Sequence, residues 1–449
     1  MRFVGKLAVI LVMVMAGVGS KITEPVRREG RRLYVGDQVF RFAGFNAYWM
    51  GLDENVGWEG GVNYPTPFRV DDALLSAVEM QATVVRAHTL GISTGNPLSF
   101  EPNLHEFRNF ALNRIHYAVY RAGELGLRLI IPLTDNWKYY HGGKHDFTEW
   151  EGIARQRYFY FNEEVISDFE EYIAHLLLTP SNYTGLPLAE DPTVMAWETG
   201  NELVAPANWT GRIARYIKSI DAMHLVQDGT PLVEMVTDAS LELDAVDMYT
   251  DHLYPLSVKR FELDERRMAM HEKVFYVGEY GWNTGDLPRF LKKVEESVVT
   301  SGDLFWSFFP HDDNWGFVQH DDGFTVHYPG DTPEMVRDVV LLRSHALTQQ
   351  GVAGPVPHVI PPAPLIRVAN RTTLAWRGAA AAAAYVVTCV CEEAGGATLS
   401  FFQDDNHTPL QNYLAEIQCS TLSVPIRVTV TGENADLVRG TPSESVRVL

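Results

Sequence analysis

Cysteine and positive charge are both scarce in this 449-residue sequence, and each shortage argues against a class of protein. The only cysteines are Cys389, Cys391 and Cys419, close to the C-terminus, which argues against a catalytic cysteine or a disulfide-rich scaffold. We expect one disulfide between Cys419 and either of the other two. Positive charge is also scarce, because the sequence has 37 Lys and Arg residues but 57 Asp and Glu residues, which gives a net charge of -20. A nucleic-acid partner is not expected, since phosphate binding needs a basic surface.

The sequence also lacks the patterns that bind cofactors and metals. No glycine-rich phosphate loop follows a strand-like segment, and no pair of cysteine or histidine motifs has zinc spacing. Two acidic clusters, HDDNW at 311–315 and HDDGF at 320–324, lack the spaced oxygen ligands of a calcium loop. We therefore expect neither a metal nor a cofactor, and interpret both clusters as solvated loops or as hydrogen-bonding partners of hydroxyl groups.

Long apolar runs are absent except at the N-terminus. There, Arg2 and Lys6 precede the apolar stretch 7–18 and then small residues, which is typical of a signal peptide over 1–20. The stretch is short for a membrane span, although an uncleaved anchor is the alternative. We expect a secreted, extracellular protein that does not contact the membrane after signal cleavage. Four glycosylation sequons agree with this route: Asn182, Asn208, Asn370 and Asn406.

Strand-like and helix-like segments alternate through the first 350 residues. The expected strands are 40–48, 82–88, 127–133, 193–198, a weaker one near 231, 245–250, 274–280 and 303–309. Amphipathic helical segments separate them, so parallel pairing is expected. Eight such units close a (β/α)8 TIM barrel, and polar residues at the C-terminal strand ends would form its site.

The sequence divides into further parts after the barrel. We assign residues 21–350 to the (β/α)8 domain and the proline-rich stretch 351–362 to a linker. Residues 363–449 are β-rich with frequent turns, which predicts a small all-β sandwich. The ending IRVTVTGENADLVRGTPSESVRV resembles the last strands of a fibronectin type III module.

Three glutamates follow or end two of the expected strands. VMAWETGNEL places Glu198 at the edge of the fourth strand and Glu202 just beyond it, while Glu279 in VGEY ends the seventh. Cleavage of a glycosidic bond through a covalent intermediate needs two carboxyl groups about 5 Å apart, facing one cavity. Glu202 and Glu279 suit that requirement. Glu198, within its strand, is interpreted as a hydrogen-bonded support.

The order and spacing of several short motifs resemble those of family 5 glycoside hydrolases, whose two glutamates follow strands four and seven. The matching positions span residues 33–345 and are Arg86 in VVRAH, Asn201-Glu202 in GNEL, His252 and Tyr254 in HLY, Glu279 in VGEY and Trp306 in LFWSF. RFAGFNAYWM, HLYP and GDLFWSFFPHDDNWGFVQHDDGF are most similar to endo-β-1,4-mannanases. One departure is NELVAP, where mannanases usually continue as Asn-Glu-Pro-Arg.

The resemblance implies a role for each matching carboxylate and its neighbours. Glu202 would be the acid/base, protonated and with a raised pKa. Glu279 would be the ionised nucleophile, held in that state by Arg86 and oriented by the hydroxyl of Tyr254.

The remaining matching residues would contact the sugar or tune the carboxylates. Asn201 would bind the sugar 2-hydroxyl, His252 would tune the acid/base, and Trp306 would stack under the sugar at the cleavage point. Other sugar platforms are expected among the tryptophans of strand-end loops: Trp49, Trp58, Trp137, Trp150, Trp282 and Trp315.

These inferences predict a monomeric, retaining endo-β-1,4-mannosidase with a polysaccharide substrate. The nearest alternative is a β-glucan hydrolase, either an endoglucanase or an exoglucanase, or a transglycosylase of the same family. An inactive carbohydrate-binding barrel is the alternative of a different class, but it would have lost Glu202 or Glu279, and both are present. A function seated in the sandwich alone would leave the barrel carboxylates unexplained.

Overall fold

The computed structural model describes residues 20–56, 61–232, 236–391, 397–404, 410–411, 413 and 425–448. The predicted signal peptide lies outside the described residues except for its last residue, and so do Trp58, Asn406 and Cys419. Among the described residues, no helix combines the length and apolarity that crossing a membrane requires. Cys391 is disulfide-bonded and Cys389 is a buried free thiol, so of the two cysteines that the sequence left open as disulfide partners, Cys391 is the bonded one.

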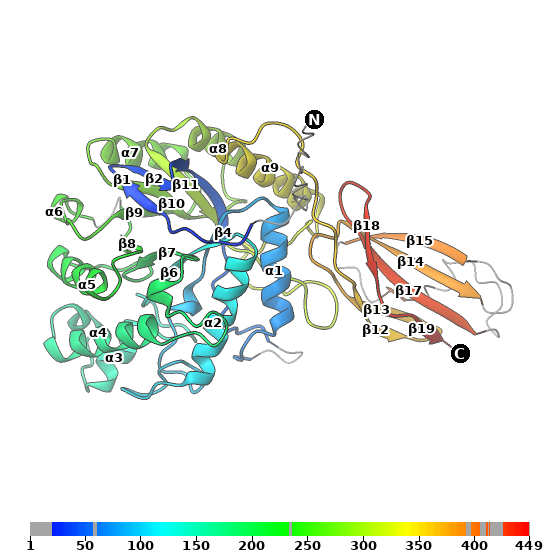
Figure 1. Cartoon of the computed structure of the whole chain (residues 1–449), viewed down its shortest axis with the longest axis horizontal. Coiled ribbons are helices and arrows are strands. Elements are labelled where there is room, and N and C mark those ends of the chain that lie inside the picture. Colours follow the sequence, from blue (N-terminus) through cyan, green and yellow to red (C-terminus); the bar gives the residue numbers. More distant parts are fainter. Residues whose placement is uncertain are drawn as a thin grey trace, which may run out of the picture.

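Eight parallel strands close into a barrel, as the alternating pattern predicted (Figure 1). They are β4 (Phe42–Asn46), β5 (Val84–Arg86), β6 (Arg128–Pro132), β7 (Val194–Glu198), β8 (Leu225–Asp228), β9 (Met248–Leu253), β10 (Val274–Tyr280) and β11 (Thr300–Phe305). The last strand, β11, pairs with the first, β4, which completes the ring. The fold is therefore a (β/α)8 TIM barrel.

The fifth strand is not where the sequence analysis placed it. The expected strand near 231 is wrong, because the chain forms β8 at Leu225–Asp228 and none of the described residues near 231 is in a strand. Gln227 and Asp228 are fully buried in β8, and their side chains accept hydrogen bonds from Tyr276 and from the Thr230 amide. Buried polar residues made this strand look too polar to be recognised.

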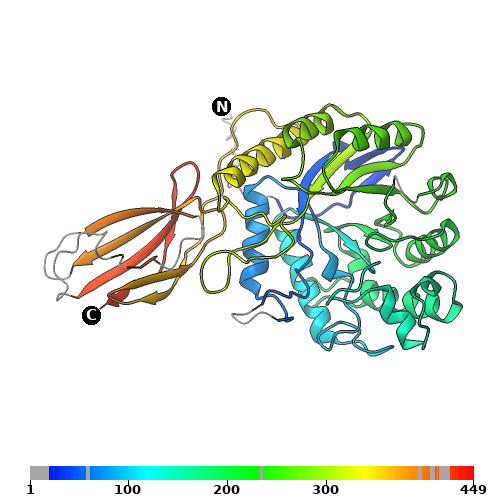
Figure 2. The same ribbon diagram turned by 180° about the vertical axis from the view of Figure 1, so that it is seen from behind.

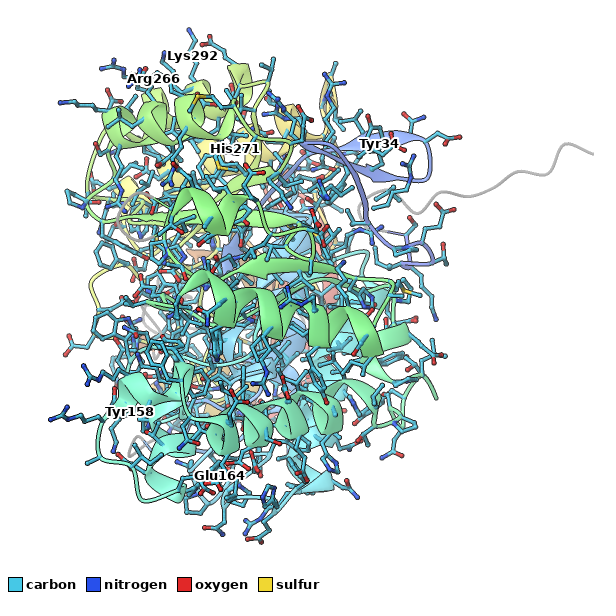
Figure 3. All side chains as sticks on the ribbon, turned by 90° about the vertical axis from the view of Figure 1, so that its left-hand side faces the viewer. Tyr34, Tyr158, Glu164, Arg266, His271 and Lys292 are labelled. Carbon is cyan, nitrogen blue, oxygen red and sulfur yellow. The ribbon has the colours of Figure 1, made fainter. Side chains whose placement is uncertain are left out.

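Helices surround the barrel, and many of their charged residues lie on the outer surface. They are α1 (Pro67–Glu79), α2 (Asn109–Glu124), α3 (Lys144–Trp150), α4 (Glu163–Leu178), α5 (Ala207–Ile220), α6 (Asp238–Leu241), α7 (Val258–Met268), α8 (Leu287–Glu296) and α9 (Pro333–Gln349). Three short 3-10 helices add to them: η1 (His88–Leu90), η2 (Gln156–Tyr160) and η3 (Leu188–Glu190). In Figure 3, Glu164, Arg266 and Lys292 project from the outer surface of this helical layer.

A short antiparallel sheet covers the N-terminal end of the barrel. It consists of β1 (Arg27–Glu29), β2 (Arg32–Val35) and β3 (Gln38–Phe40). Val26 and Leu33 pack there into one apolar cluster with residues that begin barrel strands, among them Val84 and Val274. Because this end is sealed by apolar contacts, a polar site has to open at the opposite, C-terminal end of the strands.

The C-terminal part forms two antiparallel sheets beside α1 and α9 (Figures 1 and 2). One sheet contains β12 (Leu365–Ala369), β13 (Thr373–Arg377) and β16 (Leu410–Gln411). The other contains β14 (Ala384–Cys391), β15 (Ala397–Gln403), β17 (Ile426–Glu433), β18 (Arg439–Pro442) and β19 (Val446–Val448). Their facing residues, including Trp376, Tyr385 and Val428, form a separate apolar core. We call this unit the sandwich.

Candidate active site

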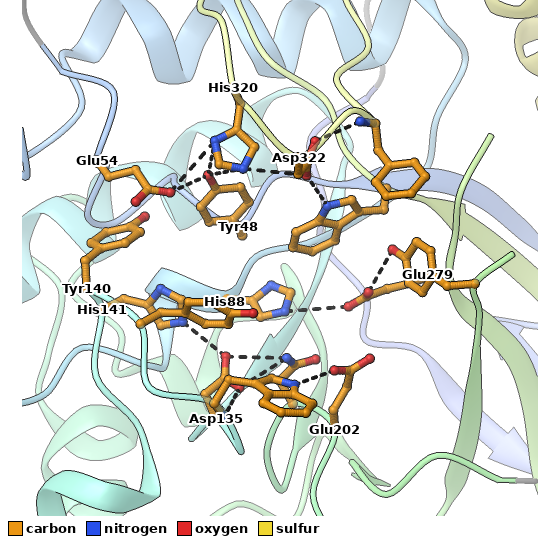
Figure 4. Close-up of a pocket in the computed structure, with 16 residues that line it drawn as sticks. Tyr48, Glu54, His88, Asp135, Tyr140, His141, Glu202, Glu279, His320 and Asp322 are labelled. Atoms are coloured by element: carbon orange, nitrogen blue, oxygen red, sulfur yellow. Dashed lines mark hydrogen bonds and ion pairs between the residues drawn. The ribbon is translucent and has the colours of Figure 1, made fainter. Parts of the chain in front are cut away.

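A cavity of about 470 Å³ opens at the C-terminal ends of the barrel strands (Figure 4). Its lining combines aromatic rings with carboxylates and imidazoles: Tyr48, Glu54, His88, Asp135, Trp137, Tyr139, Tyr140, His141, Asn201, Glu202, Tyr254, Glu279, Trp306, His320, Asp322 and Phe324. Of the seven residues that match the family 5 motifs, five line the cavity. The other two, Arg86 and His252, do not line it but contact its carboxylates. Aromatic faces beside a few polar groups suit a sugar ring.

Arg86 organises the floor of the cavity from a fully buried position at the end of β5. Its guanidinium donates two hydrogen bonds to Glu198, at 2.7 and 2.8 Å, and one to Glu279 at 2.6 Å. A further hydrogen bond of 2.8 Å reaches the side-chain oxygen of Asn201. A buried cation needs paired carboxylates to offset its desolvation, and Glu198 supplies the bidentate partner. Glu198 is thus a support for Arg86, as its place within β7 indicated.

Glu279 is the penultimate residue of β10, and both of its carboxylate oxygens accept hydrogen bonds. One oxygen accepts from Arg86, and the other accepts from the Tyr254 hydroxyl at 3.0 Å. Nδ1 of His252 lies 3.5 Å from the second oxygen. Burial raises the pKa of Glu279 above its usual value, although the charges of His252 and Arg86 pull it down. The hydrogen bonds fix the direction of the carboxylate and leave its reactive face toward the cavity.

Glu202 follows β7 in an unusual backbone conformation. Its φ is +49°, in the left-handed region that side chains seldom adopt, and such strain concentrates at functional positions. The carboxylate accepts from Nδ1 of His252 at 2.8 Å and from the indole Nε1 of Trp137 at 2.5 Å. Burial would raise the pKa of Glu202, but the hydrogen bond and charge of His252, with the Trp137 bond, lower it to about 2.

The expected raised pKa of Glu202 is therefore wrong. Burial lowers the pKa of His252, yet the negative charges of Glu279 and Glu202 raise it above its usual value. The opposite directions of the two pKa shifts favour a protonated imidazole beside an ionised Glu202. The two groups are joined by one hydrogen bond, so a proton can move between them without a water molecule.

The separation of the two carboxylates identifies the chemistry that they can perform. Oxygen atoms of Glu202 and Glu279 and a nitrogen of His252 all lie within 4.8 Å of one another. Retaining glycosidases hold their carboxyl groups about 5–5.5 Å apart, whereas inverting ones need about 6.5–9.5 Å. The same three groups offer donor atoms to a metal ion, but Arg86 already occupies one oxygen of Glu279 and places a positive charge there.

Trp306 forms the aromatic surface beside the carboxylates. Its ring stacks on Tyr48 with 5.4 Å between centroids and an interplanar angle of 10°, and its indole Nε1 donates to Asp322 at 2.7 Å. Trp137 is the other tryptophan that lines the cavity. The remaining described candidates do not line it: Trp49, Trp150, Trp282 and Trp315. Trp49 and Trp282 are buried and donate to backbone carbonyls, so they hold loops in place.

Several cavity residues were not predicted as functional. Asp135 accepts from Nε2 of His141 at 3.1 Å and from the Asn201 amide at 3.3 Å, so it fixes the orientation of Asn201. In the expected strand 82–88, His88 lies two positions after Arg86, and residues two apart along a strand share a face. That periodicity would have found His88, although the structure ends β5 at Arg86 and places His88 in η1. Asp135 follows the expected strand 127–133, so the rule that polar residues at strand ends form the site would have found it.

Comparisons with known proteins agree with this geometry. Residues 117–295 match the family model described as GH family 5 beta-mannosidase-like. Mannan endo-1,4-beta-mannosidase 2 of Oryza sativa subsp. japonica is 33% identical over 220 residues, which cover 46% of this chain and 47% of the rice protein. The chain thus spans about half the length of this curated relative.

Solved structures share the fold. The endo-1,4-beta-mannanase of Rhizomucor miehei superposes with a TM-score of 0.61 at 24% identity, covering 73% of this chain and 99% of that one. The endo-beta-1,4-mannanase of Thermotoga petrophila gives a TM-score of 0.60 at 20% identity and covers 92% of this chain and 98% of that one. Fold, cavity and family match together support a relationship between this chain and the family 5 glycoside hydrolases.

Proposed function

We propose that this protein is a retaining glycoside hydrolase that cleaves internal β-1,4-mannosidic bonds. The observation that carries the proposal is the pair Glu202 and Glu279, whose oxygens lie within 4.8 Å in one aromatic-lined cavity. That separation suits double displacement. The relatives named mannan endo-1,4-beta-mannosidases support mannan as the substrate class.

The first displacement uses the hydrogen bonds of Glu202 and Glu279 described above. The Glu279 oxygen attacks the anomeric carbon while the bond to the leaving oxygen breaks. Glu202 donates a proton to that oxygen, after receiving it from Nδ1 of His252 along their 2.8 Å hydrogen bond. Attack removes the negative charge of Glu279, and Arg86 remains neutralised by its two bonds to Glu198.

The second displacement regenerates the site. Glu202 accepts a proton from water, the water oxygen attacks the anomeric carbon, and the ester bond to Glu279 breaks. Asn201, oriented by Arg86 and Asp135, faces the cavity where the sugar 2-hydroxyl would lie. If a sugar hydroxyl replaces water, the same groups perform transglycosylation, which is the closest alternative outcome.

We also propose that the chain acts as a secreted monomer and that its sandwich is of the fibronectin III type. The N-terminal sequence and its sequons support secretion, and the two packed antiparallel sheets support the sandwich assignment. β-Glucan hydrolysis is the rival specificity, because glucose and mannose differ at one hydroxyl and NELVAP lacks the arginine usual in mannanases.

Product analysis tests the proposal. Wild type, Glu279→Gln and the control Glu164→Gln, on the outer surface of α4, are incubated with galactomannan, glucomannan, mixed-linkage glucan and carboxymethylcellulose. Manno-oligosaccharides from wild type and the control, but not from Glu279→Gln, are expected. Turnover of glucans alone would overturn the mannan assignment, and full activity of Glu279→Gln would overturn the mechanism.

A further inference from the structure

The long connection between β11 and α9 reaches both the cavity and the sandwich. Residues 311–318 form a hairpin, closed by hydrogen bonds from Asp312 to Gly316 and from Val318 to Pro310. Immediately beyond it, His320, Asp322 and Phe324 line the cavity. We call residues 311–324 the bridging loop. Its first residue touches the sandwich and its last lines the site.

His311 joins the bridging loop to both neighbouring parts of the molecule. The imidazole is 2% exposed; its Nδ1 lies 2.9 Å from Asp72 of α1, and its Nε2 lies 2.8 Å from Asp404 at the end of β15. Asp404 also accepts from the hydroxyl of Tyr385 in β14 at 2.7 Å. Removing one partner of a buried ion pair is strongly destabilising, because it leaves the other charge buried and uncompensated. The contacts with Asp72 and Asp404 therefore hold His311 firmly in place.

Further contacts join the sandwich to the same loop and to α1. Arg367 of β12 donates to the carbonyl of Asp313 at 3.0 Å, and the Arg377 guanidinium lies 3.7 Å from the centre of the Phe68 ring. A Cβ atom on Gly378 would approach Cδ2 of His311 to 2.1 Å. The sandwich backbone therefore packs directly on His311 and leaves no room for it to shift in that direction.

Ring contacts at two points of the bridging loop, joined by the short chain segment between Phe317 and His320, connect His311 with the cavity wall. The His311 ring stacks on Phe317, with 4.7 Å between centroids. Three residues on, His320 stacks on Phe309 at 5.2 Å and contacts the Tyr48 hydroxyl at 3.2 Å. Asp322 then accepts from the indole of Trp306. A displacement of the hairpin would therefore move His320 and Asp322, which are the polar partners of Tyr48 and Trp306. The rings of Tyr48 and Trp306 stack on each other beside the two carboxylates.

We propose that the sandwich is a positioning domain for the catalytic cavity, and that Asp404, through His311, fixes the bridging loop and hence His320 and Asp322. This inference rests on the proposed function, since it assigns the sandwich a part in substrate binding at the same site. Asp404 does not touch substrate and is a positioning residue.

The sandwich also has an anchor that bypasses the bridging loop, and this anchor supplies a matched control. The side chain of Asn434 donates to the carbonyl of Val359 at 3.0 Å and so ties the sandwich to the segment between the two domains. Asn434→Ala weakens docking without removing any contact to residues 311–324. Asp404→Asn keeps the shape of the side chain but removes the charge that faces His311.

Kinetics and hydrogen exchange test the inference on the full chain. For Asp404→Asn we expect KM for galactomannan to rise about 5- to 10-fold with kcat within about twofold, and amides of residues 311–324 to exchange faster. Asn434→Ala should leave both unchanged. An unchanged KM and unchanged exchange in Asp404→Asn, or equal effects in both variants, would overturn the proposal.

Two additions keep the test decisive. If Asp404→Asn does not fold, Gly378→Ala displaces His311 while preserving every charge, and the same KM increase is expected. If wild type cleaves none of the four polymers, the proposed function fails, and hydrogen exchange of the bridging loop alone then decides the positioning role. Faster exchange in Asp404→Asn but not in Asn434→Ala would support it, and equal exchange would refute it.

Discussion

Glu202 and Glu279 each accept a hydrogen bond from an aromatic side chain, and that donor group can be removed without changing the carboxylate itself. The Trp137 indole donates to Glu202, and the Tyr254 hydroxyl donates to Glu279. Both hydrogen bonds stabilise the ionised carboxylate and therefore lower its pKa. Because one carboxyl must be protonated and the other ionised, loss of the two donors should affect opposite limbs of the pH profile.

Trp137→Phe should extend activity to higher pH. Without the indole N–H, the ionised form of Glu202 is less stable, so Glu202 binds the proton that it shares with His252 more tightly and the pair keeps that proton to a higher pH. We expect the alkaline limb of kcat/KM to move up by about 0.5–1 pH unit. The measurement is the pH dependence of kcat/KM on galactomannan. A downward shift of that limb would contradict the acid role of Glu202.

Tyr254→Phe should instead narrow the profile at its acid end. Loss of the hydroxyl raises the pKa of Glu279 further, so a smaller fraction of the nucleophile is ionised at low pH. The acid limb should move upward, and kcat/KM at the optimum should fall about 10- to 100-fold, because a bond to a charged group is lost. An acid limb that does not move would show that Glu279 is not the group that must ionise.

The position of the two glutamates at one end of the barrel could be predicted from sequence, but the directions of their pKa shifts could not. Glu202 and Glu279 follow apolar runs, and parallel strands bring such positions to one end of a barrel. The low pKa of Glu202 depends on His252 and Trp137, which are 50 and 65 residues away in the chain. No local pattern records those contacts, so resemblance alone suggested the opposite direction.

At the scale of elements, recognition depended on how apolar each strand is. β7 and β10 are buried and mostly apolar, and both were predicted within a residue or two. β8 has only four residues, and Gln227 and Asp228 make half of it polar. Inside the barrel a side-chain oxygen of each residue accepts a hydrogen bond, which offsets part of the cost of burial. A prediction based on hydrophobicity alone cannot take these hydrogen bonds into account.

Asp264 makes the packing of α7 on β9 sensitive to pH. Burial, and secondarily the negative charge of Asp251, raises the pKa of Asp264 to about 9. In the unfolded chain an aspartate titrates near about 3.9. The folded state therefore retains a proton that the unfolded state has lost, and stability decreases as pH rises from about 4 to about 9.

Asp264→Asn should remove that dependence, because the amide resembles the neutral carboxyl. We expect the variant to melt several degrees above wild type at pH 8 and close to it at pH 4, as followed by calorimetry. Glu262→Gln, at a partly exposed position on the same helix where the carboxylate pairs with Lys293, serves as the control and should change Tm by at most about 1 °C. A constant difference between Asp264→Asn and wild type at both pH values would reject the assignment.

At the scale of the whole molecule, the two predicted domains are joined by a contact that no sequence pattern indicated. The acidic cluster HDDNW was interpreted as a solvated loop, yet His311 is buried, and Asp312 and Asp313 pair with the buried Arg69. The partners of His311 are Asp72 and Asp404, more than 90 residues away in the sequence on either side. Long-range pairing of this kind emerges only once both domains are folded and docked.

His311 should make domain docking sensitive to alkaline pH. Burial alone would lower the pKa of His311, but the charges of Asp72 and Asp404 raise it to about 10. Its ordinary value in an unfolded chain is about 6.5. The ion pairs therefore contribute fully below about pH 6.5, and their contribution decreases as pH rises toward 10 and the imidazole loses its proton.

At pH 10, calorimetry is expected to show two unfolding transitions, one for the sandwich and one for the barrel. At pH 7 it should show a single transition. His311→Gln should show two transitions at both pH values, since Asp72 and Asp404 then lack their shared cation at any pH. Scattering measurements at pH 10 and room temperature should give a larger radius of gyration than at pH 7. If wild type and His311→Gln respond in parallel between pH 7 and pH 10, titration of other groups controls docking, and His311 is not the residue that senses alkaline pH.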